Sequence, residues 1–475
     1  METVDVVWIR HDLRLTDNPA LAAGRGRPLV LVFTADGVDL RAMGAASRVY
    51  LHHALKAFQK DLRDEYGARL LIRPTFDEAL TTITRAVRVE RVLWNRSYEP
   101  ALFDRDHQIE ARLKAQGLQP EVYPGSILFE PWDIKNKSGK PFKVFTPFYK
   151  TCLARGMTHK PWPKPDRIQS VDHPALQDGV VDALNLLPQG SRWDLELMRS
   201  WITTESGWWQ AWKDFRETRL PHYPTARDIP AEDGTSRLSA ALHFGQISPR
   251  SIWADARAQA PSAGTESFLR QMIWREFAIT SLFHQPTMDR LPIIAPFQDF
   301  PWADEPEQLE AWKSGRTGYP LVDAGLREML QTGWMHNRVR MIVGSFLIKN
   351  LHINWTAGFD FFWDRLVDAD RANNAMGWQW VAGCGIDPSP YFRIFNPILQ
   401  SERFDPEGTY IKRWVPELER IPARWIHSPW KAPEKVRSLA TDYPAPIVDF
   451  AESRQQALMF HDRIKSGRAS SGSWT

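Results

Sequence analysis

The stretch Gly333-Trp-Met-His-Asn-Arg-Val-Arg-Met341 decides how the C-terminal part of this chain folds. Its apolar residues recur at helical spacing, so the pattern predicts a helix over Trp334–Asn350. Within that helix Asn337, Arg340 and Met341 lie one turn apart and share a face. The sequence therefore predicts a polar helix face beside positions that belong to the core.

A second stretch, Asp368-Ala-Asp-Arg-Ala-Asn-Asn-Ala-Met-Gly-Trp-Gln-Trp380, brings carboxylates, amides and indoles together. A purely structural interpretation is a buried helix pair in which Asp368 or Asp370 neutralises Arg340, because a buried charge needs a partner. A functional site is the alternative. Spacing alone supports the two interpretations about equally.

The beginning of the chain alternates strand-like and helix-like segments. Val4–Ile9 is a short apolar run typical of a buried strand, and Asn18 and Pro19 then provide a helix N-cap and a first-turn proline. The alternation continues through strand-like Pro28–Phe33, Arg69–Ile72, Arg91–Trp94 and Glu121–Tyr123, separated by helix-like 47–66, 76–87 and 102–116. It predicts an α/β domain over residues 1–125 with a parallel, Rossmann-like sheet.

Residues 126–192 lose this pattern and are interpreted as an interdomain connector. The lysines of this region are Lys135, Lys137, Lys140, Lys143, Lys150, Lys160 and Lys164. A solvated linker is the simpler interpretation, and a basic strip alongside a nucleic-acid groove is the alternative. From residue 193 the helical period dominates, which predicts an all-helical domain over 193–465 and a small, polar, flexible tail over 466–475.

Composition narrows the possible partners and compartments. The formal net charge is +3 and the sequence pI about 8.7, so a polyanion would have to be met by a local patch. Cys152 and Cys384 are the two cysteines, and their separation suits neither a metal site nor a redox motif. The N-terminus lacks a leader pattern, and no apolar run reaches about 18 residues. We expect a cytoplasmic protein with no metal and no membrane segment.

The segment Gly234-Thr235-Ser236-Arg237-Leu238-Ser239 comes directly before a helical run. Hydroxyl groups and unpaired backbone N–H groups at a helix N-terminus can hold a phosphate. Plain helix capping is the more common role of such a segment when it is considered alone.

Taken together, Gly333–Met341, Asp368-Ala-Asp370 and Gly377-Trp-Gln-Trp380 resemble the flavin-binding core of the DNA photolyase and cryptochrome family. The resemblance extends from Trp8-Ile-Arg-His-Asp-Leu-Arg14 to about Pro429. It implies FAD as cofactor. The residues that it implies for FAD binding are Tyr223, Thr235, Ser236, Arg237, Leu238, Ser239, Phe268, Arg340, Asp368, Asp370 and Asn374.

Some of these residues have specific expected roles. A positive charge at Arg340 would stabilise the anionic form of a reduced flavin. Asn374 matches the position that faces flavin N5, where photolyases carry asparagine and plant and animal cryptochromes carry other residues. Trp378, Trp355 and Trp302 match the family's electron-transfer tryptophans, through which the flavin is photoreduced.

The resemblance also implies a substrate. Trp274 and Trp380 match the indoles that clamp a flipped pyrimidine dimer, and flat apolar rings can replace the stacking that an extruded base loses. Asn337 and Met341 lie beside them. Photolyases for the (6-4) lesion carry histidines at these two positions, so we expect a cyclobutane dimer. Residues expected to meet the DNA are Arg227, Gln271, Trp274, Arg275, Asn337, Arg338, Arg393 and Gln400.

Gln271 departs from the family pattern, because cyclobutane-dimer photolyases usually carry glutamate there. Glutamine keeps the hydrogen-bonding capacity but loses the charge. We expect repair to persist at lower efficiency, and a changed lesion preference is the alternative. Gln271 therefore joins Asn374, Trp274, Trp380, Asn337 and Met341 as an expected catalytic residue.

The family's α/β domain carries an antenna chromophore, and the resemblance implies here a folate, a deazaflavin or a flavin, with an empty site as the alternative. Ala101 and Leu102 replace the Asn-Glu pair that holds a folate in one bacterial subgroup, so that folate pose is not expected. The sequence as a whole predicts a monomeric bacterial-type photolyase that acts on DNA containing pyrimidine dimers. A cryptochrome-like blue-light photoreceptor that binds FAD without repair is the alternative, favoured by Gln271 and opposed by Asn374 and Met341.

Overall fold

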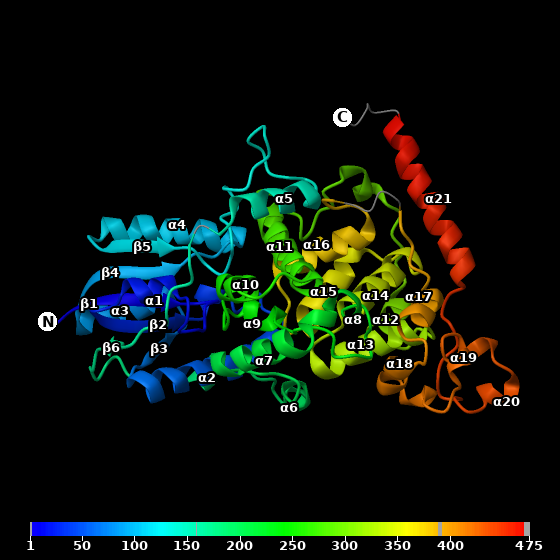
Figure 1. Cartoon of the computed structure of the whole chain (residues 1–475), viewed down its shortest axis with the longest axis horizontal. Coiled ribbons are helices and arrows are strands. Elements are labelled where there is room, and N and C mark those ends of the chain that lie inside the picture. The colour runs from blue at the N-terminus through cyan, green and yellow to red at the C-terminus, as the bar shows by residue number, and fades with distance from the viewer. Residues whose placement is uncertain (1, 158, 388–391, 470–475) are drawn as a thin grey trace. The chain divides into compact units, whose positions relative to one another are not determined.

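A computed structural model describes residues 2–157, 159–387 and 392–469 (Figure 1). The chain divides into two compact units. Unit 1 comprises Met1–Pro221, Ser236–His284 and Val367–Ala369, and unit 2 comprises His222–Thr235, Gln285–Leu366 and Asp370–Thr475. The predicted domain boundaries remain predictions.

Unit 1 contains the predicted parallel sheet. Its strands are β1 (Thr3–Ile9), β2 (Pro28–Thr34), β3 (Leu70–Arg73), β4 (Arg88–Asn95) and β5 (Gln119–Tyr123), in the order β3-β2-β1-β4-β5, with β6 (Gln169–Ser170) paired to β2. The helices between them are α1 (Pro19–Ala23), α2 (Ala45–Tyr66), α3 (Phe76–Ala86) and α4 (Pro100–Ala115). The predicted α/β fold is therefore confirmed, including the Asn18 cap of α1, whose side chain accepts the Leu21 N–H.

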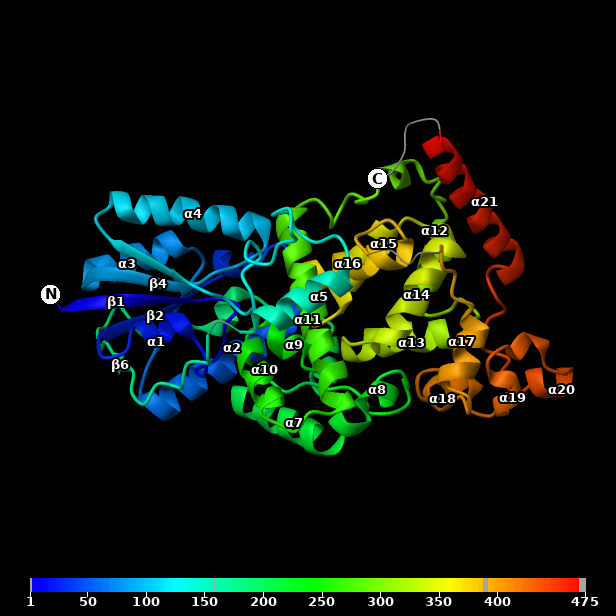
Figure 2. The same ribbon diagram turned by 45° about the horizontal axis from the view of Figure 1, so that its top comes forward.

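The side chains of the central strand β1 alternate between the two faces of the sheet, and helices pack against both faces. Val4, Val6 and Trp8 point to one face, where they pack with residues of α3 and α4. The Trp8 ring lies 4.3 Å from the Phe76 ring, and its indole N–H donates to Thr34 Oγ1 at 3.0 Å. In Figures 1 and 2, α2 lies on the opposite side of the strands from α4.

The predicted connector is not irregular throughout. It contains helix α5 (Phe145–Arg155) as well as β6 and the short helix η2 (Val181–Leu184). Phe145, Phe148 and Cys152 are buried along one face of α5 at helical spacing. The surrounding lysines and prolines obscured this period in the sequence.

The remaining helices of unit 1 are α6 (Trp193–Met198), α7 (Glu205–Thr218), α9 (Ser239–His243), α10 (Pro249–Arg257) and α11 (Ala263–His284). Helix α11 packs against α5 and α10. Its residue Glu276 is buried and accepts hydrogen bonds from the backbone N–H groups of Leu128 and Phe129 at 2.8 and 3.2 Å. Burial raises the pKa of Glu276, although Arg275 and these two N–H groups oppose the shift.

Unit 2 is helical, as predicted, and no strand occurs among its described residues. Its α-helices are α8 (Tyr223–Ala226), α12 (Pro306–Lys313), α13 (Pro320–Thr332), α14 (Asn337–Lys349), α15 (Trp355–Arg365), α16 (Arg371–Ala382), α17 (Pro397–Phe404), α18 (Thr409–Trp414), α19 (Ala423–Ile426), α20 (Glu434–Arg437) and α21 (Phe450–Ala469). Helix α21 extends into the predicted tail, and residues 470–475 of that tail lie outside the described residues.

Helix α14 begins three residues later than the sequence pattern predicts. The His336 ring is its N-cap, because Nδ1 accepts the Arg338 N–H at 3.2 Å. The Gly333–His336 segment before it is not helical. Helix α14 packs against α13, α15 and α16.

Trp378 of α16 fills the space between α14 and α15. Its ring is 4 % exposed and lies against the backbone of Gly358, where a Cβ atom would overlap the indole. A Cβ on Gly344 of α14 would also touch this ring, at 3.4 Å. Two glycines therefore allow the three helices to approach one bulky indole. No helix in the described ranges is long and apolar enough to cross a membrane.

Gly358→Ala is expected to force the Trp378 ring to move and to lower the free energy of unfolding by about 1–3 kcal/mol, measured by urea denaturation. Gly377→Ala is the matched control in α16, because a Cβ there would meet no atom within 4 Å. That control should change the free energy of unfolding by less than about 1 kcal/mol. Equal losses in the two variants would contradict the packing described.

Candidate functional site

The N-terminal turn of α14 carries several of the predicted site residues. Asn337 is exposed, and its side-chain amide lies 3.9 Å from the Met341 sulfur, one turn further along the helix. The Arg340 Nε donates to the Met335 carbonyl at 2.7 Å. The predicted neighbourhood of Asn337, Arg340 and Met341 is therefore present on one partly exposed helix end.

Arg338 is held in place by two contacts. Its guanidinium pairs with Asp228 at 2.7 Å and lies 4.6 Å above the Phe404 ring. A charged, bidentate side chain that is fixed in this way loses little conformational entropy when it meets an anion. Arg227, next to Asp228, lies over the Tyr223 ring at 5.3 Å.

The charges around His336 create a positive local potential. This side chain is 1 % exposed, and burial is the main cause that lowers its pKa from 6.5 to about 4. Arg338, Arg340 and Arg227 add to the lowering, and Asp228 opposes it. Burial, with these charges as smaller contributions, therefore keeps the His336 side chain neutral above about pH 4.

Helix α16 begins at a predicted cofactor residue. Asp370 is its N-cap and accepts the Asn373 N–H at 2.8 Å and the Asn373 side-chain amide at 2.6 Å. One turn later, the Asn374 side-chain Nδ2 donates to the Phe359 carbonyl at 3.1 Å. This bond fixes the amide, and no described residue donates to its Oδ1. The carbonyl oxygen of Asn374 is thus available to accept from a ligand N–H group.

One face of α16 is open. Asn373 and Gly377 are exposed, and Asn374 and Trp380 are partly exposed. A Cβ on Gly377 would meet no atom within 4 Å, so the helix backbone itself borders free space between an amide and an indole. A flat ring system can approach a helix closely only where side chains are absent. This exposed stretch of backbone borders the predicted cofactor residue Asn374 and the predicted substrate residue Trp380.

The three predicted electron-transfer tryptophans differ in exposure. Trp378 is 4 % and Trp355 2 % exposed, whereas Trp302 is partly exposed and stacks on Phe300 at 4.2 Å. Trp378 contacts the rings of Phe362 and Trp312 at 4.9 and 6.4 Å, and Trp355 contacts Phe359 at 6.4 Å. No ring contact joins any two of the three within the described ranges. The electron-transfer role of these three tryptophans remains a prediction.

The Gly234–Ser239 segment leads into α9. Arg237 adopts a left-handed backbone with φ of +52°, and Ser236 Oγ accepts the Leu238 N–H at 3.4 Å. No side-chain cap hydrogen bond to α9 occurs among the described residues, and Ser236 and Ser239 lie at its N-terminus. This chemistry fits a phosphate. Thr235 precedes it in unit 2.

Helix α11 of unit 1 carries four more predicted residues. Phe268 is buried against Trp212, with ring centroids 5.1 Å apart. Gln271 is partly exposed, and its amide lies 3.5 Å from the Ser267 carbonyl of its own helix. Arg275 pairs with Glu276 at 3.1 Å, which gives this predicted DNA-binding residue a partner inside the protein.

Trp274 has a stacking partner that sequence reasoning missed. The Phe145 ring of α5 lies 3.6 Å from the Trp274 ring, with an interplanar angle of 5°. Phe145 therefore covers one face of the indole, and the Trp274 residue as a whole is partly exposed. The apolar period of α5 was the signal that could have revealed this partner.

Arg393 and Gln400 lie on a segment that is anchored by a hydrogen bond from the buried Lys349. Lys349 Nζ donates to the Arg393 carbonyl at 2.6 Å and lies 4.2 Å above the Phe392 ring. Burial lowers the pKa of Lys349 to about 7, against the opposing effect of Cys384. Arg393 is exposed, and Gln400 is partly exposed on α17. Nothing in the sequence distinguished Lys349 from a surface lysine.

Asp368 is buried and belongs to unit 1, whereas Arg340 and Asp370 belong to unit 2. The expected neutralisation of Arg340 by one of these carboxylates remains a prediction. The roles that the family resemblance implies for the individual site residues are likewise predictions.

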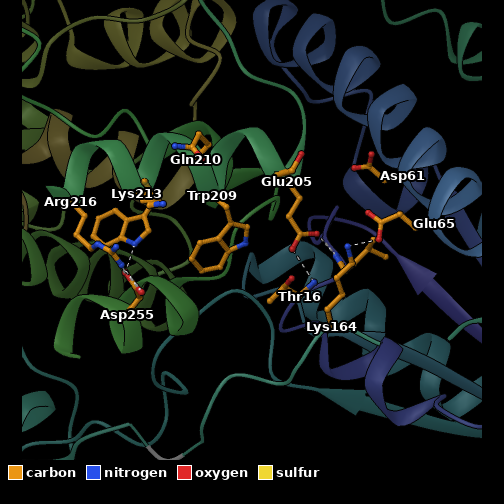
Figure 3. A pocket seen from close by; sticks show the side chains of 13 residues that line it. Thr16, Asp61, Glu65, Lys164, Glu205, Trp209, Gln210, Lys213, Arg216 and Asp255 are labelled. Atoms are coloured by element: carbon orange, nitrogen blue, oxygen red, sulfur yellow. Dashed lines mark hydrogen bonds and ion pairs between the residues drawn. The ribbon is translucent and has the colours of Figure 1, made fainter. Parts of the chain in front are cut away.

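A pocket of about 440 Å³ in unit 1 contains none of the predicted site residues (Figure 3). The polar side chains that line this pocket largely form their hydrogen bonds and ion pairs with neighbouring groups of the protein. Glu205 accepts the N–H groups of Leu15 and Thr16 at 2.6 and 3.0 Å, and Arg216 pairs with Asp255 at 2.7 Å. This pocket is therefore not the candidate site.

Comparisons with known proteins agree with this geometry. The FAD binding domain of DNA photolyase matches residues 268–462, and the DNA photolyase domain matches residues 5–166. The chain is 38% identical to the deoxyribodipyrimidine photo-lyase of Agrobacterium fabrum, over 97% of this chain and 98% of that protein. It is 34% identical to cryptochrome-1 of Arabidopsis thaliana, over 94% of this chain and 69% of the cryptochrome. A bacterial class III photolyase from Agrobacterium tumefaciens superposes with a TM-score of 0.93 at 38% identity and covers 98% of both chains.

The buried His336 makes stability depend on pH in a predictable way. Between pH 6.5 and about 4 the unfolded chain binds a proton at this position and the native chain does not, so the free energy of unfolding falls as pH falls. The expected contribution is about 3 kcal/mol. His336→Asn keeps a capping side chain and should remove this part of the pH dependence in urea denaturation.

The exposed His107 provides the control for this measurement. His107→Asn should leave the wild-type pH dependence intact. If the His336→Asn protein retained the wild-type slope between pH 6.5 and 4, His336 would not be a buried neutral group.

Proposed function

Because this chain belongs to the DNA photolyase family, we propose that it repairs cyclobutane pyrimidine dimers in DNA with FAD and light. The photo-lyases among its relatives support its assignment as an enzyme of the photo-lyase class. The open face of α16 beside the positive end of α14 is the observation that carries the proposal.

FAD, when bound, supplies the absorption of light and the electron that splits the dimer. Arg340 stabilises negative charge on the cofactor ring, aided by the potential of Arg338 and Arg227. The Asn374 Oδ1 accepts a hydrogen bond from the ring, because its Nδ2 is already engaged by the Phe359 carbonyl. Asp368 and Asp370 hold sugar hydroxyls.

The pyrophosphate of FAD is negatively charged and requires an anion-binding site. The uncapped N-terminus of α9 and the hydroxyls of Thr235, Ser236 and Ser239 hold the pyrophosphate. Tyr223, Arg237, Leu238 and Phe268 complete the cofactor site in this proposal.

The dimer lies against the free face of Trp274 and against Trp380. Phe145 fixes the Trp274 ring plane, so a flipped base meets an ordered surface. Asn337 and Met341 contact the dimer and offer no titratable group. His336 does not act as an acid, because it is buried, neutral and engaged as a helix cap. These features support a cyclobutane lesion over a (6-4) lesion.

The alternative function is blue-light sensing without repair, as in a cryptochrome. Gln271 favours it, because a neutral amide stabilises a radical anion less than a carboxylic acid that can share its proton. Trp302, Trp355 and Trp378 would photoreduce the flavin in either case. A second antenna chromophore in residues 1–125 and a monomeric state remain predictions.

The test is illumination of purified, photoreduced protein with an oligonucleotide that carries one cyclobutane thymine dimer. Thymine absorbance should recover in the light, whereas a dark sample and a (6-4) oligonucleotide should remain unchanged. Protein with bound, reducible FAD that restores no absorbance would contradict repair and favour the sensor.

Gln271→Glu is expected to raise the number of dimers repaired per absorbed photon, because a protonated glutamate can donate its proton in a hydrogen bond to the dimer radical anion, whereas glutamine has no such proton to share. Gln259→Glu, at an exposed position in the same unit, is the matched control and should have no effect. An equal yield in wild type and Gln271→Glu would show that the carboxylate is unnecessary here.

A further inference from the structure

The loop before α5 presents a row of exposed lysines. Residues 134–144, called here the lysine arm, include Lys135, Lys137, Lys140 and Lys143, and all four side chains are exposed. None of them makes an ion pair with any residue in the described ranges. The arm stands out from the neighbouring ribbon in Figure 1.

Several other surface lysines of this chain are paired with a carboxylate. The pairs include Lys56–Asp182, Lys60–Asp64, Lys114–Glu110 and Lys313–Glu310. The carboxylate beside the arm, Asp133, is already paired with Arg155 at 2.9 Å. The arm is therefore a local concentration of unneutralised positive charge on a chain whose net charge is only +3.

The arm is ordered by its own hydrogen bonds. Asn136 Oδ1 accepts the N–H groups of Ser138 and Lys140, both at 3.0 Å, and the Asn136 N–H donates to the Lys140 carbonyl at 2.8 Å. Gly139 closes the turn with φ of +75°. A preformed turn presents its charges with a smaller entropy cost than a flexible linker would.

The base of the arm is fixed to the helix that carries Trp274. Arg155 donates to the Asp133 carbonyl at 3.0 Å, and His284 of α11 lies 3.2 Å from the Pro131 carbonyl. At the other end, Phe145 stacks on Trp274. Both ends of the arm are therefore held against α11.

The length of the arm sets its reach from Trp274. Lys143 and Lys140 precede Phe145 by two and five residues, which limits their separation from it to about 7 and 18 Å. Phosphates follow one another along a DNA strand every 3.4 Å or so. Lys140 and Lys143 thus lie within about five nucleotide steps of Phe145, which stacks on Trp274.

We propose that the lysine arm binds the phosphate backbone of the DNA duplex beside the lesion. The proposal rests on the proposed repair of dimers in DNA and adds a second contact surface to it. Lysines on a turn make point contacts with phosphates and read no base sequence, so the arm strengthens binding to DNA of any sequence.

The test compares two variants with the same change in charge. Lys135→Gln, Lys137→Gln, Lys140→Gln and Lys143→Gln are combined in the arm variant. Lys56→Gln, Lys60→Gln, Lys114→Gln and Lys313→Gln, all at ion-paired positions, are combined in the control. The dissociation constant for a dimer-containing duplex is measured for the holoenzyme over a range of salt concentrations, together with flavin content and melting temperature.

The slope of log K against log salt should become shallower by between about 2 and 4 in the arm variant, because each lost phosphate contact removes about 0.9. Affinity at low salt should fall on the order of tenfold or more. The control should keep the wild-type slope. On a duplex that extends less than about five base pairs past the lesion, the difference between wild type and the arm variant should shrink.

The outcomes separate the arm from the repair activity. Equal slopes and affinities for the arm variant and the control overturn the arm proposal, whatever the repair yield. Wild-type protein that binds the duplex but repairs nothing overturns the repair function alone, and the slopes still decide the arm. Wild-type protein that does not bind the duplex overturns both. At saturating protein, light-driven repair should be the same in all three proteins.

Discussion

The packing of the Trp378 ring against the bare backbone of Gly358 and Gly344 is the constraint on which the rest of unit 2 depends. Because one indole occupies the space between α14 and α15, the axis and rotation of α16 are fixed. Asn373, Gly377 and Trp380 of α16 then lie on its more exposed side, and Asn374 lies at the border of that side, one turn before Trp378. A structural residue in the core thus determines which side of the helix is open to a ligand.

Charged side chains near the N-terminus of α14 are the second feature of this site. Three arginines gather at the N-terminus of α14, and the buried ring of His336 stays neutral between them. The neutral histidine caps the helix without adding charge, and Asp228 pairs with Arg338. In the proposed function, Arg340 would stabilise the reduced, anionic form of the flavin ring, which is the form from which repair begins.

Much of this fold could be predicted because local patterns determined it. The five long strands of the sheet, the Asn18 cap and the helix that carries Asn337 and Met341 follow from period and capping chemistry. The Phe145–Trp274 stack could not be found in this way, because it joins residues that are distant in sequence. Lys349 was missed for a related reason: its burial results from tertiary packing and is absent from any local pattern.

We propose that the open face of α16 holds the cofactor ring. The most direct measurement is the flavin content of purified Gly377→Leu protein, since a leucine there would fill the free space beside Asn374. The account predicts a folded protein with a normal circular dichroism spectrum and little bound FAD. A folded variant that retains the wild-type amount of FAD would contradict it.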